Sequence, residues 1–332
     1  MSRYAATCEI REGLAVIVLT DAACKATAEL LPAAGNNLYR FESKGHPVIM
    51  PPASLQSLKN EPFEAFKYGT PILFPPNRVK RGRFSFRGRQ YSLPLNEPPD
   101  NHLHGEISSR GWEVIEQGAS DHGGASVTSR FHYALHPELL EYFPHPLSFT
   151  VTYRLFEGRL MMDTKIRNDG EDEAPFAFGL HPYFSIPFKS GEQLALKVPA
   201  TSEWPVTNEA FVMGTPAVTP FSQALKEGVS MTDYPRLGCS LLGLDEEAAD
   251  HTCRIEMKDS GYAITYRFDR KFPFLVLFRP DWAEAYSLEP YTSVTDAFNL
   301  PYGHELTGAR GIGAGEEIRF STSLAVDALV QE

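Results

Sequence analysis

The stretch that decides the fold is SFTVTYRLFEGRLMMDTKIRN, residues 148–168. Apolar and more polar residues alternate on both sides of Glu157-Gly158, so every second side chain would lie on one face of an extended segment. Two alternating runs separated by a glycine-containing turn are typical of a β-hairpin. These residues therefore predict two antiparallel strands, each with one buried face.

The same period of two recurs along the chain. Residues 254–269 repeat the hairpin pattern around Asp259-Ser260-Gly261, and residues 84–93 repeat it around Arg87-Gly88. Further strands are expected at 14–19, 125–134 and 272–278, whereas helical patterns are weak: residues 22–31 fit a short helix or a strand followed by a turn, and 51–68 and 222–225 are no stronger. Many strands without alternating helices predict one all-β domain spanning residues 1–332, built as a large antiparallel β-sandwich or barrel.

Composition limits the functional classes. The 42 acidic and 31 basic residues give a net charge of −11, which argues against nucleic acid or an anionic membrane surface as the main partner. The four cysteines form no CxxC pair and no zinc-type grouping, which favours a reduced protein, although one disulfide stays open. The N-terminal residues lack the apolar run of a signal peptide, and no segment has the length of a membrane span. We expect a cytoplasmic protein that is a monomer or a homodimer.

Three short segments carry most of the specific chemistry. They are Asn101-His102-Leu103-His104-Gly105, Gly179-Leu180-His181-Pro182-Tyr183-Phe184 and Ser287-Leu288-Glu289-Pro290-Tyr291. Each sets an ionisable side chain among apolar and turn-forming neighbours. If the three segments converge, they bring two imidazoles and one carboxylate to one cleft, which is enough for acid–base chemistry on a neutral substrate.

The His102-Leu103-His104 segment has three interpretations. In an extended segment both imidazoles lie on one face. In the first interpretation they are half-buried histidines of a loop. In the second they are ligands of a cupin-type metal site, together with Glu106. In the third, one of them is a catalytic histidine held by a tight turn at Gly105.

His181 and Glu289 each have a catalytic and a structural interpretation. Pro182 restricts His181 to extended geometry, and its aromatic neighbours would partly desolvate the ring. Burial of Glu289 before Pro290 would raise its pKa towards that of a useful general base. The structural alternatives are a buried histidine bonded to backbone and an ion pair between Glu289 and an arginine.

A basic segment precedes the first histidines. Arg78 follows the turn-forming Pro75-Pro76-Asn77 and could be aimed at a ligand as a fixed donor. By contrast, the alternation from Arg83 to Arg87 fits a strand with one wet face. The chain has no glycine-rich phosphate loop and no serine or cysteine nucleophile motif, so covalent catalysis is poorly supported.

Taken in order, these segments resemble the aldose 1-epimerase (galactose mutarotase-like) family. The similarity runs from about residue 35 to residue 302, through 71–78, the 84–95 hairpin, 101–105, 181–184 and 288–291. Glu106 stands where the better-known galactose mutarotases usually have a second glycine, and the Glu-Pro-Tyr-Thr run from Glu289 is similar to divergent bacterial branches of the family.

The resemblance implies an antiparallel β-supersandwich with a sugar cleft and a cofactor-free, metal-free isomerase that interconverts the α and β anomers of an aldohexose. It implies that Glu289 is the general base at the anomeric hydroxyl and that His181 is the general acid at the ring oxygen. His104 would bind near the ring oxygen or share the acid role. Substrate-binding residues would be Arg78, Asn77 and Asp233, with Asp245 as a rival for the aspartate.

Three alternatives remain open at this point. A hexose-6-phosphate 1-epimerase would use some of Arg78, Arg81 and Arg83 on the phosphate. A non-catalytic carbohydrate-binding or sensing protein would share the fold without the activity. A metal-dependent β-barrel enzyme would use His102 and His104.

Overall fold

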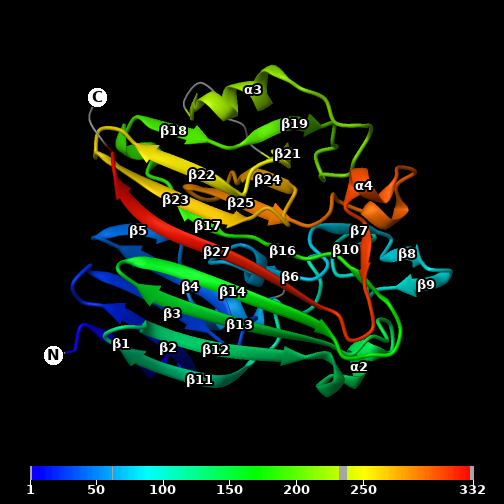
Figure 1. Ribbon diagram of the computed structural model, residues 1–332, viewed down its shortest axis with the longest axis horizontal. Helices are drawn as coiled ribbons and strands as arrows, with labels where there is room; N and C mark the ends of the chain where they lie inside the picture. Colours follow the sequence, from blue (N-terminus) through cyan, green and yellow to red (C-terminus); the bar gives the residue numbers. More distant parts are fainter. Residues whose placement is uncertain (1, 62, 232–237, 330–332) are drawn as a thin grey trace.

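The computed structural model describes residues 2–61, 63–231 and 238–329, about half of which lie in antiparallel sheets (Figure 1). Strands β13 (Leu147–Phe156) and β14 (Arg159–Asn168) pair along their whole length, which confirms the hairpin predicted from residues 148–168. Glu157 and Gly158 connect them with φ angles of 50° and 71°. Positive φ at both turn residues matches the twist of the flanking strands, which is why the hairpin closes tightly here.

The larger sheet has twelve strands drawn from both halves of the chain. In order across the sheet they are β1 (Tyr4–Arg11), β2 (Leu14–Asp21), β3 (Ala26–Leu31), β4 (Asn37–Ser43), β5 (His46–Ile49), β17 (Tyr183–Ser185), β25 (Ala285–Tyr291), β24 (Phe274–Arg279), β21 (Gly238–Leu244) and β19 (Ala200–Trp204). Two short strands, β16 (Gly179–Leu180) and β6 (Ile72–Leu73), extend from β25.

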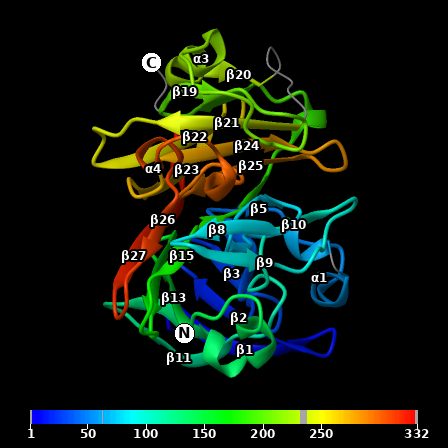
Figure 2. The same ribbon diagram turned by 90° about the vertical axis from the view of Figure 1, so that its right-hand side faces the viewer.

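The second sheet has nine strands. Their order is β11 (Glu113–Ser120), β12 (Gly124–His132), β13, β14, β27 (Glu317–Ala328), β23 (Tyr262–Asp269), β22 (Asp250–Met257), β18 (Leu194–Lys197) and β20 (Val229–Ser230). Three short pairs complete the β structure: β7 (Arg78–Lys80) with β10 (Asn101–Leu103), β8 (Arg83–Phe86) with β9 (Arg89–Ser92), and β15 (Ala174–Phe176) with β26 (Arg310–Ile312). Strands β7, β8, β9 and β10 lie together at one end of the molecule, on the right in Figure 1, and this end faces the viewer in Figure 2.

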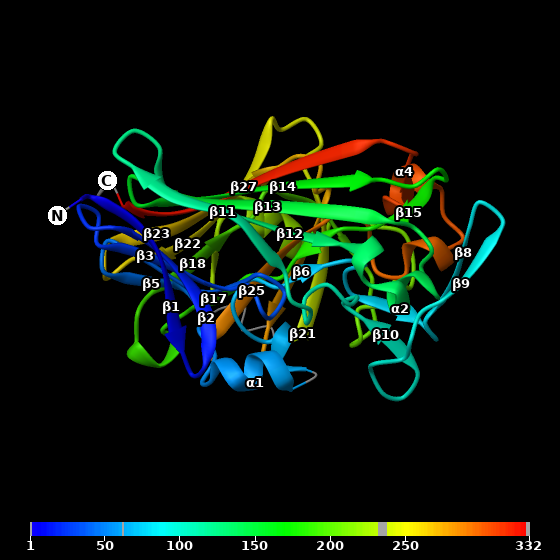
Figure 3. The same cartoon turned by 90° about the horizontal axis from the view of Figure 1, so that it is seen from below.

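The two sheets pack face to face as two layers, which confirms the predicted antiparallel β-sandwich (Figure 3). Side chains of both inner faces form one large apolar cluster, which includes Leu275, Leu277 and Leu288 of the larger sheet. Because side chains alternate along a strand, the intervening residues of β24 and β25 lie on the outer face of the same sheet. Val276 and Tyr291 belong there to a second, smaller cluster, and this outer face carries the site.

Helices are short and few among the described residues. They are α1 (Leu55–Asn60), α2 (Pro137–Leu140), α3 (Pro220–Glu227) and α4 (His304–Thr307), with 3-10 turns at Glu64–Phe66, Tyr133–Leu135, Phe188–Ser190 and Ala297–Asn299. Helix α1 begins at Ser54, whose side chain accepts hydrogen bonds from the backbone of Gln56 and Ser57. No helix among the described residues combines the length and hydropathy needed to cross a membrane.

The other predicted elements can be placed as well. The strands expected at 14–19, 125–134 and 272–278 are confirmed as β2, β12 and β24, and the hairpins at 254–269 and 84–93 are confirmed as β22–β23 and β8–β9. The helix interpretation of residues 22–31 was wrong, whereas the strand of the other interpretation is confirmed as β3, with one turn before it at 22–25 and another after it. Pairing on both sides, with β2 and with β4, outweighs the helix propensity of this alanine-rich stretch.

Candidate active site

The three predicted segments meet at one cavity of about 280 Å³ on the outer face of the larger sheet. His104, His181 and Glu289 all line it, as do Asn77 and Arg78. The three ionisable side chains are buried, at 7%, 4% and 2% exposed. Segments that are 77 and 108 residues apart therefore place two imidazoles and one carboxylate in one space.

Strand register explains how His181 reaches Glu289. Alternation along β25 sends Leu288 into the main core and places Glu289 on the outer face. Strand β17 pairs with β25 so that Tyr183 lies opposite Ser287. His181 lies two residues before Tyr183, and Glu289 lies two residues after Ser287. Because the strands are antiparallel, His181 and Glu289 lie side by side. The His181 Nε2 atom lies 3.4 Å from Glu289 Oε1.

The Glu289 carboxyl group is isolated from water but not from hydrogen-bond donors. The hydroxyl of Tyr291 donates to Oε2. Burial raises the pKa of Glu289 from its ordinary value of 4.5 to about 8, and the hydrogen bond from Tyr291 opposes this only partly. A carboxyl group with such a pKa is a stronger base when ionised than an exposed one.

A serine orients the ring of His181. Ser287 Oγ lies 3.0 Å from the carbonyl oxygen of Pro182, to which it donates, and 2.8 Å from His181 Nδ1. Since the single hydroxyl proton goes to the carbonyl, Nδ1 carries a proton and Oγ accepts it. Neutral His181 thus presents the lone pair of Nε2 to Glu289 and to the Tyr183 hydroxyl, which lies 3.3 Å away.

Burial acts on His181 and Glu289 in opposite directions. It lowers the pKa of His181 from 6.5 to about 3, because an imidazolium is costly in a dry site. Together with the raised pKa of Glu289, this leaves the pair uncharged overall, with one exchangeable proton between the carboxyl oxygen and Nε2. If that proton moves from Glu289 to His181, the pair becomes a carboxylate facing an imidazolium and still holds the same number of protons as the neutral pair. Hydroxyl groups of a ligand that stabilise the carboxylate would therefore move this proton to His181 without any exchange with solvent.

His104 is held by a turn that only glycine permits. His104 and Gly105 have φ angles of 61° and 69°, and a Cβ atom on Gly105 would lie 1.9 Å from the carbonyl oxygen of Phe74. The backbone N–H of Asn77 donates to His104 Nδ1 at 3.1 Å, and the N–H of His104 donates to the Asn77 carbonyl at 3.0 Å. This pattern leaves a proton on Nε2 of His104. Burial and the neighbouring His181 keep the pKa of His104 well below 6.5, so the ring is a neutral donor.

The comparisons with known proteins agree with this geometry. A family model described as aldose 1-epimerase matches residues 17–325. The chain belongs to the aldose 1-epimerase family. It is a divergent member: it is 30% identical over 142 residues to the uncharacterized protein YihR of Escherichia coli, covering 42% of this chain and 43% of YihR. It is 25% identical over 265 residues to the uncharacterized protein YphB of the same organism, covering 77% and 83% of the two chains.

Solved structures show the same fold for this aldose 1-epimerase family member. A galactose mutarotase-like protein from Clostridium acetobutylicum superposes with a TM-score of 0.88, covering 98% of this chain and 99% of that one at 23% identity.

His102 is not among the residues that line the cavity, and its ring contacts the backbone instead. Its Nδ1 atom lies 2.7 Å from the carbonyl oxygen of Pro94, while His104 bonds to Asn77. The left-handed φ of His104 breaks the extended geometry that would put both rings on one face. Over residues 2–61, 63–231 and 238–329, no group of three or more His, Cys, Asp or Glu side chains is arranged to hold a metal ion.

Arg78 lines the cavity of this family member, but its guanidinium is already engaged. Nε donates to one carboxylate oxygen of Glu97 at 2.7 Å, Nη2 donates to the other, and Nη1 donates to the Glu209 carbonyl at 2.8 Å. Arg81 is exposed and pairs with Asp100. Arg83 lines a separate surface hollow with Arg81, so neither of these two arginines is among the described lining of the cavity.

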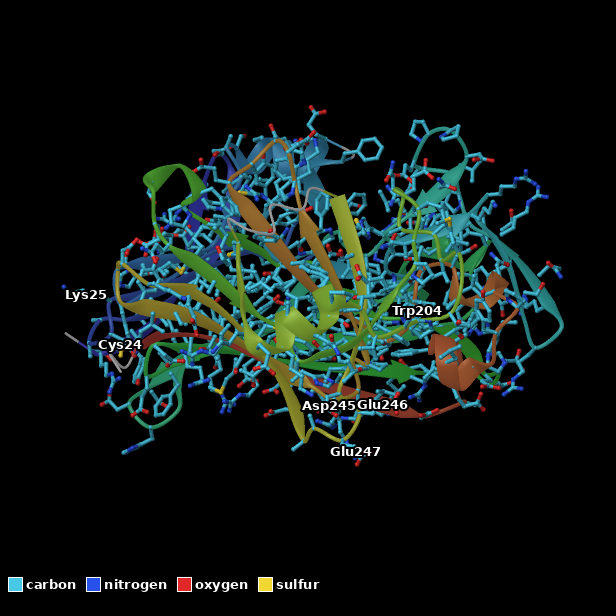
Figure 4. All side chains as sticks on the ribbon, turned by 90° about the horizontal axis from the view of Figure 1, so that it is seen from above. Cys24, Lys25, Trp204, Asp245, Glu246 and Glu247 are labelled. Carbon is cyan, nitrogen blue, oxygen red and sulfur yellow. The ribbon has the colours of Figure 1, made fainter. Side chains whose placement is uncertain are left out.

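The two aspartate candidates differ in what can be said of them. Asp233 lies outside the described residues. Asp245 lies in the turn after β21, among the outer loops in Figure 4. Gly238 and Cys239, at the opposite end of that strand, are the residues of β21 that line the cavity. At about 3.3 Å per residue, Asp245 is roughly 20 Å along the strand from them, too far to touch the same sugar.

Several residues of the site gave no sequence signal of their own. Ser287, Glu97 and Cys239 sit in unremarkable strand or loop contexts, and Trp282 follows an ordinary Pro-Asp turn. Ser287 alone could have been found, because it is two residues before Glu289 and must share its face of the strand. The Cys239 thiol is not a nucleophile here, since burial raises its pKa to about 12.

Proposed function

We propose that the protein is a mutarotase, an aldose 1-epimerase that interconverts the α and β anomers of a neutral aldohexose. One observation carries the proposal. A buried carboxyl group and a buried imidazole lie 3.4 Å apart, and both line one cavity. Anomer exchange needs one proton removed from the anomeric hydroxyl and one delivered to the ring oxygen, which is the task that this pair suits.

The proposed reaction conserves protons throughout. The Glu289 carboxylate takes the proton of the C1 hydroxyl while Nε2 of protonated His181 gives its proton to the ring oxygen. The bond between C1 and the ring oxygen breaks, and an open-chain aldehyde forms. Rotation about C1–C2 presents the other carbonyl face, and the reverse transfers close the ring as the opposite anomer. Burial strengthens both partners, since it raises the pKa of Glu289 and lowers that of His181.

His104 complements the pair as a fixed donor. Its ring centroid lies 5.2 Å from that of His181, and the bond from Asn77 to Nδ1 leaves Nε2–H free to donate. A donor at this point would hold the ring oxygen or an adjacent hydroxyl in line with His181. Such pre-aligned donors lower the barrier without a change in their own protonation.

The charges around the cavity favour a neutral sugar over a hexose 6-phosphate. Among the described residues that line the cavity, the cations are Arg78, which donates to both carboxylate oxygens of Glu97, and Lys67, which pairs with Glu64 at 2.9 Å. Binding a phosphate through either residue would have to break an existing ion pair. Arg81 and Arg83, which a phosphate site would also need, belong to other surfaces.

Exchange spectroscopy by NMR tests the proposal directly. The wild-type protein should speed exchange between the anomers of glucose or galactose. Glu289→Gln and His181→Asn should each lower the rate by about 100-fold or more, the usual contribution of a general acid or base. His122→Asn, in an exposed turn, is the matched control and should retain full activity.

Three outcomes would contradict the proposal. Unchanged exchange across a panel of free sugars would remove the activity. Saturable sugar binding by calorimetry without exchange would identify a sensing protein on this fold. Turnover confined to phosphorylated hexoses would overturn the assignment of a neutral substrate.

A further inference from the structure

The buried hydroxyl of Tyr291 has no part in the proposed reaction, although it contacts the proposed base. Tyr291 lies two residues after Glu289 on β25, and because side chains alternate along a strand, both lie on the outer face of the sheet. Tyr291 is fully buried, and its hydroxyl donates to Oε2 of Glu289. Tyr291 is not among the residues that line the cavity, so it can act on a bound sugar only through Glu289.

Strand β16 leaves a space that the Tyr291 ring fills. Gly179 of β16 pairs with Tyr291 in the sheet. A Cβ atom on Gly179 would lie 2.4 Å from Cδ1 and 2.8 Å from Cε1 of the ring. Both distances are shorter than any van der Waals contact, so the ring occupies the volume that a side chain at position 179 would need. The tyrosine hydroxyl is therefore aimed at Glu289 before a ligand binds.

The two carboxyl oxygens of Glu289 consequently have different neighbours. Oε2 accepts from Tyr291, whereas Oε1 lies 3.4 Å from Nε2 of His181. Burial and the adjacent carboxyl group keep the pKa of Tyr291 well above its ordinary value of 10, so the phenol stays a donor. Because Oε2 already faces a donor, the proton of the neutral carboxyl group lies on Oε1, the oxygen nearest to His181.

Other ionisable groups share the cavity with Glu289, and they come from the elements packed around β25. Arg78 favours the carboxylate form of Glu289, but its guanidinium is bound to Glu97. Burial raises the pKa of Tyr183 and that of Cys239 and lowers the pKa of His104, so these three groups stay uncharged. The ionisable residues that line the cavity are Arg78 of β7, Lys67, His104 after β10, His181 and Tyr183 around the start of β17, and Cys239 of β21.

We infer that Tyr291 is a positioning residue for the proposed reaction: its hydroxyl holds Oε2 of Glu289, so that Oε1 is the oxygen that takes the proton of the anomeric hydroxyl. This inference rests on the proposed function for the reaction itself. A donated hydrogen bond stabilises a carboxylate more than a carboxylic acid. Tyr291 therefore helps the proton on Oε1 to pass to Nε2 of His181, which leaves Oε1 free to accept the sugar proton. Gly179 supports this role, because it makes room for the tyrosine ring.

The pH dependence of kcat/KM for anomer exchange tests this role, since it reports the ionisation of the free protein. In the wild type, kcat/KM should fall as pH rises through about 8, where the pair of Glu289 and His181 loses its shared proton. Tyr291→Phe keeps the ring and removes the donor, so the carboxyl group holds its proton more tightly. The alkaline limb should then move up by about 1–2 pH units, and kcat/KM below the limb should drop by about 10- to 100-fold. Loss of packing alone would leave the position of the limb unchanged.

Gly179→Ala tests the same role from the neighbouring strand. The added methyl group would displace the Tyr291 ring, so the limb should move in the same direction as in Tyr291→Phe. Gly118→Ala, on the edge strand β11 with open space around it, is the matched control, and neither glycine has a positive φ. Tyr153→Phe, which removes a buried hydroxyl in the other sheet, is the control for the tyrosine. Both controls should keep the wild-type pH profile.

Carbon-13 NMR of the glutamate side-chain carboxyl groups gives a readout without sugar. The Glu289 signal, assigned by its loss in Glu289→Gln, should titrate near pH 8 in the wild type and about 1–2 pH units higher in Tyr291→Phe. If no sugar exchanges its anomers in the wild type, the proposed function is wrong and this inference falls with it. If exchange is present but the limb or the titration stays in place in Tyr291→Phe, the proposed function stands and the role of Tyr291 is overturned.

Discussion

At the scale of single residues, Ser287 determines which nitrogen of His181 faces the sugar. Its hydroxyl joins His181 Nδ1 to the Pro182 carbonyl and is fully buried. In Ser287→Ala, Nδ1 loses its acceptor and the ring can adopt the other tautomer, with a proton on Nε2. Losing a hydrogen bond to a group that becomes charged costs about 1.5–3 kcal/mol, so kcat should fall by about 10- to 100-fold.

The measurement for Ser287→Ala must distinguish a change in the His181 ring from a loss of stability of the whole protein. Nitrogen-15 NMR of the histidine rings should show His181 protonated at Nδ1 in the wild type and a mixture in Ser287→Ala. Ser185→Ala, on neighbouring β17, is the control. An unchanged tautomer, whatever the rate, would show that Ser287 does not position the ring.

The raised pKa of Glu289 makes the free energy of unfolding depend on pH. Its pKa in the folded protein, about 8, lies above the ordinary value of 4.5. Between these values the unfolded chain has released the proton while the folded protein keeps it, so stability from this group falls as pH rises through the window. Glu289→Gln, which cannot ionise, should escape this loss.

Urea unfolding at pH 5 and pH 8 checks this expectation. The stability advantage of Glu289→Gln over wild type should grow between the two pH values by on the order of a few kcal/mol, given about 1.4 kcal/mol per pKa unit. Glu116→Gln, on the exposed edge strand β11, should show no such growth. A constant difference between variant and wild type would mean that Glu289 ionises normally in the folded state.

At the scale of elements, the hairpins could be predicted from the sequence, but the hydrogen bonds between segments that are distant in sequence could not. Alternation over 148–168 is local, so the sequence alone suffices for β13 and β14. The bonds between Asn77 and His104, and between Ser287 and His181, depend on how strands distant in sequence pair. Short apolar runs such as 22–31 do not distinguish helix from strand, and only pairing with both neighbours decides them.

The turn after β10 is sensitive to substitution of Gly105. Gly105→Ala would place a methyl group against the Phe74 carbonyl, and it would also strain a residue at positive φ. Gly88→Ala is a matched control, since Gly88 has a φ of 78° and open space around it. Both should pay about 1 kcal/mol for the left-handed backbone. Gly105→Ala should lose about 1–3 kcal/mol more from overpacking, and its anomer exchange should drop because His104 moves. Equal losses in the two variants would contradict this role of the turn.

At the scale of the whole molecule, the chain interleaves its two halves in both sheets. The larger sheet places β5 next to β17 and then β25, and the smaller one places the last strand, β27, between β14 and β23. A cut at any point between β5 and β27 would separate two strands that pair in the interior of a sheet, either β5 from β17 or β14 from β27. The site has the same dependence, since Asn77 and His104 come from one half of the chain and Glu289 from the other.

This interleaving predicts a single cooperative unfolding transition, although chains beyond about 150 residues commonly populate intermediates. Two single-tryptophan variants report on the two halves: one keeps Trp112, next to β11, and the other keeps Trp204, at the end of β19 (Figure 4). Both side chains are buried, so each should change its emission sharply on unfolding. If the two layers form one domain, both probes should report the same transition. In each variant, the fluorescence midpoint in urea should coincide with the midpoint for the loss of β-sheet signal in circular dichroism. Separate midpoints within one variant, with one half losing structure before the other, would instead divide the chain into two units, each stable without the strands that the other contributes.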